Sequence, residues 1–154
     1  LNVNGTHMLK ADYTTPGTDN VWTNSMDRYG INNAVTFRNI ARFTAAVDSG
    51  KMVNSLTLNY RNGYTDAAAN PYNVATKANI PVAIRLQVPS YSTIDYQGKY
   101  NISKQWDVRL GVKNLTDKEP PLSLRTSSGH QVGYDPRYAD TMGRTLYLNT
   151  SYTF

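Results

Sequence analysis

The sequence contains no cysteine and only two histidines, His7 and His130. The lack of cysteine excludes disulfide frameworks and thiolate chemistry. Zinc sites usually need three or four protein ligands at defined spacing, so two isolated histidines make a poor metal site. We therefore expect neither a metal nor another bound cofactor.

Long apolar runs are also missing. No stretch approaches the ~18 consecutive apolar residues of a transmembrane helix, and the charged start and apolar run of a signal peptide are absent. Hydropathy alone would thus favour a soluble protein. That inference fails for β-barrels, because only every second residue of a barrel strand faces lipid and each segment gives a weak signal.

Acidic residues are fewer than basic residues, with 11 Asp and Glu against 16 Lys and Arg. The excess of five positive charges would suit an anionic partner such as nucleic acid or a lipid headgroup. The basic residues are scattered, however, and do not form the basic patch of a nucleic-acid-binding domain. We expect no nucleic-acid partner.

The sequence does contain repeated strand-like alternation of apolar and polar residues. In residues 143–154, GRTLYLNTSYTF, every second side chain falls on one face: Leu146, Leu148, Thr150, Tyr152 and Phe154. The same period of two recurs in residues 105–114, 91–102, 52–64, 41–48 and 1–13, where His7 is the misfit on the apolar face. The pattern predicts an all-β, antiparallel fold of about six strands without helices.

The segments between these strands alternate in length. Residues 48–51 and 103–105 are tight turns, whereas residues 14–34, 65–90 and 116–142 are long and rich in Gly, Pro, Asn, Asp and Thr. This layout is typical of bacterial outer-membrane barrels, which have short periplasmic turns and long extracellular loops. In a compact soluble domain, structureless loops beyond about 15 residues would count against the assignment.

Strand length and aromatic placement favour a transmembrane β-barrel over a soluble sandwich. Twelve residues extend roughly 40 Å, and a tilt near 40° leaves about 30 Å, enough for the ~25 Å apolar band of a membrane barrel. Four aromatic residues are predicted to lie at the short-turn end of the apolar face, as a periplasmic aromatic girdle: Tyr100, Trp106, Tyr152 and Phe154. The alternative is a soluble β-sandwich binding module with these rings in its core, although soluble strands average about five to six residues.

Four motifs occur in a fixed order in the last part of the chain. They are SYSTID at 90–95, LGVKNLTDKEPPLS at 110–123, GYDPRYAD at 133–140, and the final GRTLYLNTSYTF with its closing phenylalanine. In this order they resemble the C-terminus of TonB-dependent receptors. Asn114, Leu115 and Asp117 match the family's N-L-x-D element, while Thr116 stands where many members carry phenylalanine. A weaker resemblance continues upstream at 5–6, 40–43 and 59–66, with His7 in place of an aromatic residue.

Each motif also has a plain physical reading. Asn114 and Asp117 favour the end of a strand, because Asx side chains hydrogen-bond to nearby backbone. Pro120 and Pro121 cannot donate a hydrogen bond to a sheet ladder. Taken singly the motifs are therefore weak, and their order carries the resemblance.

The resemblance implies that residues 1–154 are the C-terminal portion of a receptor barrel whose plug domain and earlier strands are absent. Such receptors import scarce, bulky ligands, such as iron-siderophore complexes, cobalamin or oligosaccharides, across the outer membrane. The implied partners are outer-membrane lipid, the barrel-assembly machinery and, through the missing N-terminal part, the TonB complex. Within this chain, Phe154, Tyr152 and Leu148 resemble the terminal pattern that the assembly machinery reads.

Ligand contacts are expected from the long loops, where four residues are candidate surface groups: Tyr134, Asp135, Arg137 and Tyr138. A passive porin-like channel would share the alternation and the girdle but would lack the order of the motifs. An outer-membrane enzyme would need a nucleophile, a base and an orienting group within reach. Ser127, Ser128 and His130 lie close together in sequence near Asp135, but such clustering in one loop is common by chance, and we expect no enzymatic activity.

Overall fold

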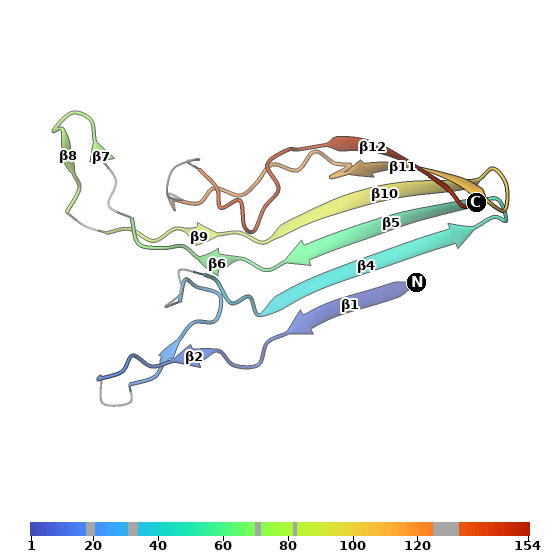
Figure 1. Ribbon diagram of the computed structural model, residues 1–154. Helices are drawn as coiled ribbons and strands as arrows, with labels where there is room; N and C mark the ends of the chain where they lie inside the picture. Colours follow the sequence, from blue (N-terminus) through green and yellow to red (C-terminus); the bar gives the residue numbers. More distant parts are fainter. Residues whose placement is uncertain (18–20, 31–33, 70–71, 82, 125–132) are drawn as a thin grey trace.

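The computed structural model describes residues 1–17, 21–30, 34–69, 72–81, 83–124 and 133–154. Its main element is one antiparallel sheet of six strands in the order β1-β4-β5-β10-β11-β12, seen side by side in Figure 1. The strands are β1 (Asn2–His7), β4 (Asn39–Asp48), β5 (Met52–Arg61), β10 (Tyr91–Asn101), β11 (Trp106–Lys113) and β12 (Thr145–Tyr152). The predicted all-β, antiparallel class is confirmed. The described residues contain no helix that is long and apolar enough to cross a membrane.

Two tight turns join the long strands at one end of the sheet (Figure 1). Between β4 and β5, the amide of Gly50 donates to Asp48 Oδ1 at 2.9 Å, and Gly50 adopts a φ of 77°. Between β10 and β11, the hydroxyl of Ser103 accepts hydrogen bonds from the amides of Gln105 and Trp106. Short polar side chains thus satisfy turn backbone, as their positions in the sequence predict.

The strands are shorter than the predicted twelve residues. β4 and β5 each have 10 residues, β10 has 11, and β11 and β12 each have 8. Residues 1–13 were expected to be one strand, but β1 ends at His7 and a separate short strand, β2 (Asp12–Tyr13), follows. Residues 52–64 are likewise divided at Asn62 and Gly63. A Cβ on Gly63 would lie 2.4 Å from the carbonyl oxygen of Val88, so only glycine allows this close approach.

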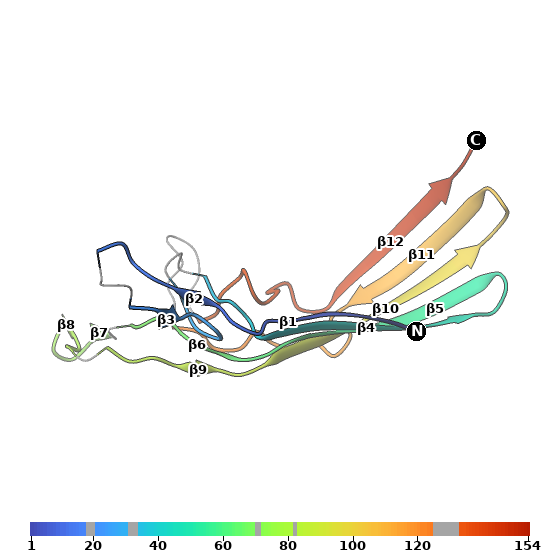
Figure 2. The same ribbon diagram turned by 90° about the horizontal axis from the view of Figure 1, so that it is seen from below.

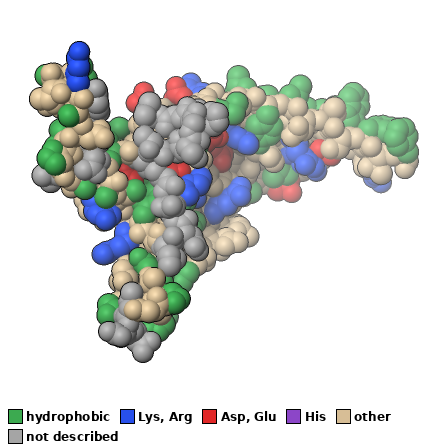
Figure 3. All heavy atoms as spheres, turned by 60° about the vertical axis from the view of Figure 1, so that its left-hand side comes forward, with side chains coloured by type: hydrophobic (Ala, Val, Ile, Leu, Met, Phe, Trp, Pro, Cys, Tyr) green, Lys and Arg blue, Asp and Glu red, His purple; other side chains and the backbone are tan. Residues whose placement is uncertain are grey.

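The pairing register places the apolar positions of all six strands on one face. Leu110 of β11 lies between Gly98 of β10 and Leu148 of β12, and Phe43 of β4 lies between Val3 and Leu58. We call this the apolar face and the opposite one the polar face. In Figure 3, hydrophobic side chains gather along one side of the sheet and charged ones along the other.

The apolar face is exposed, unlike the core-facing side of a soluble sheet. Leu110 and Leu148 on the apolar face are 54% and 68% exposed, whereas Thr57 on the polar face is only 8% exposed. Thr57 is covered by a hydrogen-bonded contact with the hydroxyl of Thr44. The sheet is twisted and open, with β1 and β12 at its edges (Figure 2).

The long loops gather at the other end of the sheet and contain short strands of their own, which the sequence analysis did not predict. β2 pairs with β3 (Thr23–Asn24), β6 (Tyr64–Thr65) pairs with β9 (Gln87–Val88), and β7 (Tyr72–Asn73) pairs with β8 (Ala78–Asn79). The pairing of β6 with β9 extends β5 and β10 beyond the sheet. The long loops are therefore partly structured.

Candidate functional site

Side chains from all three long loops pack together above the loop end of the sheet. We call this group the loop cluster; it consists of Tyr29, Val35, Phe37, Tyr64, Val88 and Tyr138. The ring of Tyr64 makes edge contacts with three others, at centroid distances of 5.6 Å to Phe37 and 5.8 Å to both Tyr29 and Tyr138. Edge-to-face packing of this kind adds to the stability gained from burial alone.

Arg61, at the end of β5, connects the loop cluster to the sheet. Its guanidinium carbon lies 4.9 Å from the centroid of Phe37 and 5.5 Å from that of Tyr138, and it donates a hydrogen bond to the carbonyl of Tyr138. Cation–π contacts strengthen where water is excluded. Arg61 is therefore held in place as a fixed positive charge beneath the third loop.

Asp135 is the main polar link between the first and third loops. Its carboxylate accepts hydrogen bonds from the Tyr29 hydroxyl, from Arg137 Nη2 at 2.6 Å and from Arg137 Nε at 3.0 Å. The expectation that Asp135 is a surface group is wrong, since only 4% of it is exposed. Its side chain turns inward because Tyr29, distant in sequence, supplies a buried donor.

The hydrogen bonds among Asp135, Tyr29 and Arg137 shift the pKa values of all three side chains. Burial raises the pKa of the Asp135 carboxyl, but the hydrogen bonds from Arg137 and Tyr29 outweigh burial and leave that pKa below its ordinary value. Burial, followed by the hydrogen bond to Asp135, raises the pKa of the Tyr29 hydroxyl. The hydrogen bond to Asp135 likewise raises the pKa of Arg137. The ionised carboxylate with a protonated tyrosine and arginine is thus the stable arrangement.

The other predicted ligand-contact residues lie beside this link. The hydroxyl of Tyr138 accepts a hydrogen bond of 2.7 Å from the amide of Val35, and its ring belongs to the loop cluster. The guanidinium of Arg137 lies over the rings of Tyr29 and Tyr138 and remains exposed. Tyr134 is half-buried. The structure thus brings Asp135, Arg137 and Tyr138 together in a structural role, and ligand contact by any of the four stays a prediction.

Two further carboxylates, one fully buried and one half-buried, tie the loops together and were not predicted from the sequence. Asp66 is fully buried, and its Oδ2 accepts hydrogen bonds from Ser123 Oγ at 2.9 Å and from the amide of Leu124 at 2.5 Å. Asp27 Oδ1 accepts from the amide of Arg38 and from Asn62 Nδ2, both at 2.7 Å. Asp66 follows the NGYT motif, but nothing in the local pattern indicates a partner 57 residues away.

The N-L-x-D element ends β11 as its side chains predict. Asn114 Oδ1 accepts from the amide of Lys118 at 2.8 Å, its Nδ2 donates to the carbonyl of Lys118, and its φ is 51°. Asp117 Oδ1 accepts from the amide of Arg144 at 2.8 Å. The element therefore also contacts the Gly-Arg-Thr motif directly before β12.

The predicted girdle residues lie together at the short-turn end of the apolar face. Trp106 is the register partner of Tyr152, and its ring nitrogen donates to Thr150 Oγ1 at 2.7 Å. The ring centroids of Tyr152 and Phe154 are 5.1 Å apart. Tyr100 lies on the same face and is also exposed, while Leu148, the third residue of the predicted assembly pattern, lies farther along β12. The structure thus brings Trp106, Tyr152 and Phe154 close together, and the girdle and the roles in membrane contact and assembly stay predictions.

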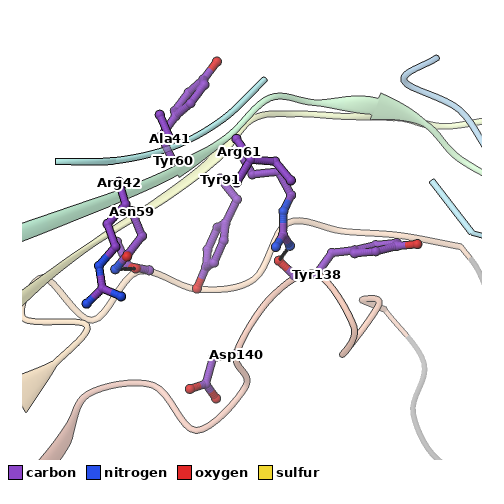
Figure 4. A pocket seen from close by; sticks show the side chains of 10 residues that line it. Ala41, Arg42, Asn59, Tyr60, Arg61, Tyr91, Tyr138 and Asp140 are labelled. Carbon is purple, nitrogen blue, oxygen red and sulfur yellow. Dashed lines mark hydrogen bonds between the residues drawn. The ribbon is translucent and has the colours of Figure 1, made fainter. Parts of the chain in front are cut away.

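A hollow of about 340 Å³ lies on the polar face next to the loop cluster. Figure 4 shows Arg42, Asn59, Arg61 and Tyr91 on the same side of the sheet, facing the segment that carries Tyr138 and Asp140. A second hollow of about 310 Å³ adjoins it along the sheet and includes Arg42, Asp95 and Lys113. Arg42 is common to both hollows.

Comparisons with known protein families, with curated proteins and with solved structures give no match to this chain. The described residues hold no group of three or more His, Cys, Asp and Glu side chains that could bind a metal ion. His7 is engaged in a hydrogen bond of 2.7 Å with Asn39. Ser127, Ser128 and His130, considered above as a hydrolytic group, lie outside the described residues.

Proposed function

We propose that this chain forms six adjacent strands of the barrel of an outer-membrane TonB-dependent receptor. The receptor imports a scarce, bulky ligand of the iron-siderophore, cobalamin or oligosaccharide class. The observation that carries the proposal is the uncharged, exposed face that continues across the whole sheet.

The distribution of charge on the two faces supports a lipid environment. The pairing register puts no Lys, Arg, Asp or Glu on the apolar face of any long strand. Every charged residue of these strands lies on the polar face: Arg42, Asp48, Arg61, Asp95, Lys99, Asp107, Arg109 and Lys113. A Lys or Arg on the lipid face costs about 2–4 kcal/mol at the membrane midplane, so this segregation is what a barrel wall requires.

The dimensions of the strands are compatible with this assignment. Strands of 8 to 11 residues extend roughly 26–36 Å at about 3.3 Å per residue. With a tilt near 40°, they cover roughly 20–28 Å of membrane thickness, close to the ~25 Å apolar band of outer-membrane barrels. The girdle aromatics at one end and the long loops at the other fit the periplasmic and extracellular sides.

The open edges of the sheet imply further strands in the assembled protein. β1 and β12 each have one long-strand partner, so one side of each strand lacks a ladder within the described chain. Unpaired backbone groups cost several kcal/mol each in lipid, which offers no water to satisfy them. We infer that strands outside this sequence pair with β1 and β12 and close the barrel.

A passive porin-like channel would share the wall but would not depend on TonB. The order of the N-L-x-D, G-Y-D-P and G-R-T motifs favours the receptor, and the structure gives the first and last a shared role at the start of β12. The proposal is tested by locating the full-length protein and measuring its heat-modifiable gel mobility in outer-membrane fractions. Uptake of candidate ligands is then compared with and without TonB. Absence from the outer membrane would refute the proposal, and uptake that persists without TonB would favour the passive channel.

A further inference from the structure

Arg42 is a cation without an ion-pair partner at the junction of the two hollows. Across the strands it faces Asn4 and Asn59, both neutral. In the part of the chain that the structure describes, no carboxylate lies within 4.0 Å of its guanidinium, whereas Arg109 on the same face pairs with Asp107 at 3.1 Å. Arg42 therefore has donors available for a group that enters either hollow.

The two acids that share a hollow with Arg42, Asp95 and Asp140, each accept hydrogen bonds from other groups. Asp95 Oδ2 accepts from Asn59 Nδ2 at 2.8 Å, and its Oδ1 accepts from the amide of Asn114 at 2.9 Å. Asp140, on the far wall of the first hollow, accepts from the amide of Met142 at 2.9 Å. Neither carboxylate forms an ion pair with Arg42 in the described residues.

The first hollow carries a net positive charge. Two guanidinium groups, those of Arg42 and Arg61, line it together with one carboxylate, that of Asp140. Arg61 cannot turn away, because two rings and the carbonyl of Tyr138 hold it. Arg61, which is fixed, and Arg42, which has no ion-pair partner, together attract an anion into the hollow by charge. Arg42 can then position the anion through its hydrogen-bond donors.

We propose that the first hollow binds an anionic oxygen group, a carboxylate or a phosphate, of the imported ligand, with Arg42 as its direct partner. The planar guanidinium matches both groups in a bidentate geometry. A volume of about 340 Å³ is at the lower end of ligand pockets, so the hollow takes the acidic end of a bulky ligand and not the whole of it. This inference rests on the proposed function and narrows its ligand class to acidic solutes.

The test uses the full-length receptor purified in detergent and three probes in calorimetric titrations: glucuronate, glucose and inorganic phosphate. Glucuronate differs from glucose only in carrying a carboxylate in place of a hydroxymethyl group. We expect glucuronate or phosphate to bind at one site, more weakly at higher salt, with glucose at least tenfold weaker. The stronger of the two anions identifies the preferred group.

Variants assign the binding to the hollow. Arg42→Gln is expected to weaken anion binding at least tenfold, and Arg42→Lys, which keeps the charge and loses the bidentate geometry, to lie between that variant and the unaltered protein. Arg109→Gln is the matched control on the same face, and its affinity should stay within twofold. Binding that is equal for glucose and glucuronate, or unchanged in Arg42→Gln, overturns the proposal.

One further result would overturn it. If neither anion binds and Arg42→Gln instead lowers the melting temperature of the receptor, a carboxylate of the receptor itself fills the hollow. Heat-modifiable mobility on the same samples separates this failure from that of the proposed function. If the protein assembles in the outer membrane but binds no anion, only the proposal of an acidic ligand is refuted. If the protein is absent from that membrane, the receptor assignment itself is refuted.

Discussion

Replacing Leu110 by arginine tests the assignment of the apolar face most directly. Leu110 is in the middle of β11, between Gly98 and Leu148, and its side chain is 54% exposed on a face without charged residues. In a barrel wall this position lies near the membrane midplane. There an arginine on the lipid face costs about 2–4 kcal/mol, because its charge loses water without gaining a partner.

The expected loss of folding free energy in Leu110→Arg is large enough to measure and to separate from ordinary packing effects. A loss of 2–4 kcal/mol lowers the folding equilibrium constant by roughly 30-fold to 900-fold. We expect the midpoint of urea unfolding of the full-length protein, folded into lipid vesicles, to fall accordingly, with folded protein followed by heat-modifiable mobility. The slope of the transition should stay the same, since the surface exposed on unfolding is unchanged.

The matched control introduces the same side chain on the polar face. Ser55 lies at mid-strand in β5 and lines the second hollow, which has room for an arginine. Ser55→Arg should cost much less than Leu110→Arg, and Lys113→Gln, also on the polar face, should change stability little. Equal losses in Leu110→Arg and Ser55→Arg would show that the two faces do not differ in environment, and the assigned membrane orientation would then be wrong.

Three further predictions concern assembly, the loops and the polar face. Phe154→Asp should lower the amount of heat-modifiable receptor in outer-membrane fractions while leaving the ligand affinity of the assembled fraction unchanged; normal levels with weakened binding would refute this. Because the pKa of Asp135 is lowered in the folded protein, its contribution is present above the ordinary carboxyl pKa and is lost as pH falls through the lowered value. Amides around Tyr29 should therefore exchange faster with solvent on acidification, and Asp135→Asn should remove this dependence; an unchanged dependence would argue against the link. A Cβ at Gly111 would lie 2.0 Å from the Tyr147 ring, so Gly111→Val should destabilise the sheet, and Tyr147→Ala should restore most of the loss; no rescue would mean that the ring is not the cause.

The sheet could be predicted because its causes are local in sequence. Alternation of period two fixes which side chains share a face, and the Asp48-Ser49-Gly50 turn fixes which strands are neighbours. The exact strand ends could not be predicted in the same way. β5 stops at Arg61 because Gly63 must pass within contact distance of Val88, and Val88 reaches that place only through the pairing of β6 with β9.

The loop cluster could not be predicted because its causes are distant in sequence. Tyr29 and Asp135 are 106 positions apart, and Val35 and Tyr138 are 103 apart. Loop residues carry no periodicity that would reveal such partners. The GYDPRYAD motif therefore suggested exposed groups, while the structure uses its first aspartate, Asp135, and its second tyrosine, Tyr138, to join two loops.

The same cluster bears on how a ligand reaches the polar face. Polar links at Asp27, Asp66 and Asp135 hold the loops, and each is a carboxylate that accepts at least two hydrogen bonds. At Asp66 and Asp135, which are buried, the loss of one partner leaves a buried acceptor unsatisfied, which costs more than the loss of an exposed contact. The three loops should therefore move as one unit. If the proposed ligand enters the hollow beneath Tyr138, it should therefore pass beside the loop cluster rather than through it, where Arg42, three residues after the start of β4, lines the hollow.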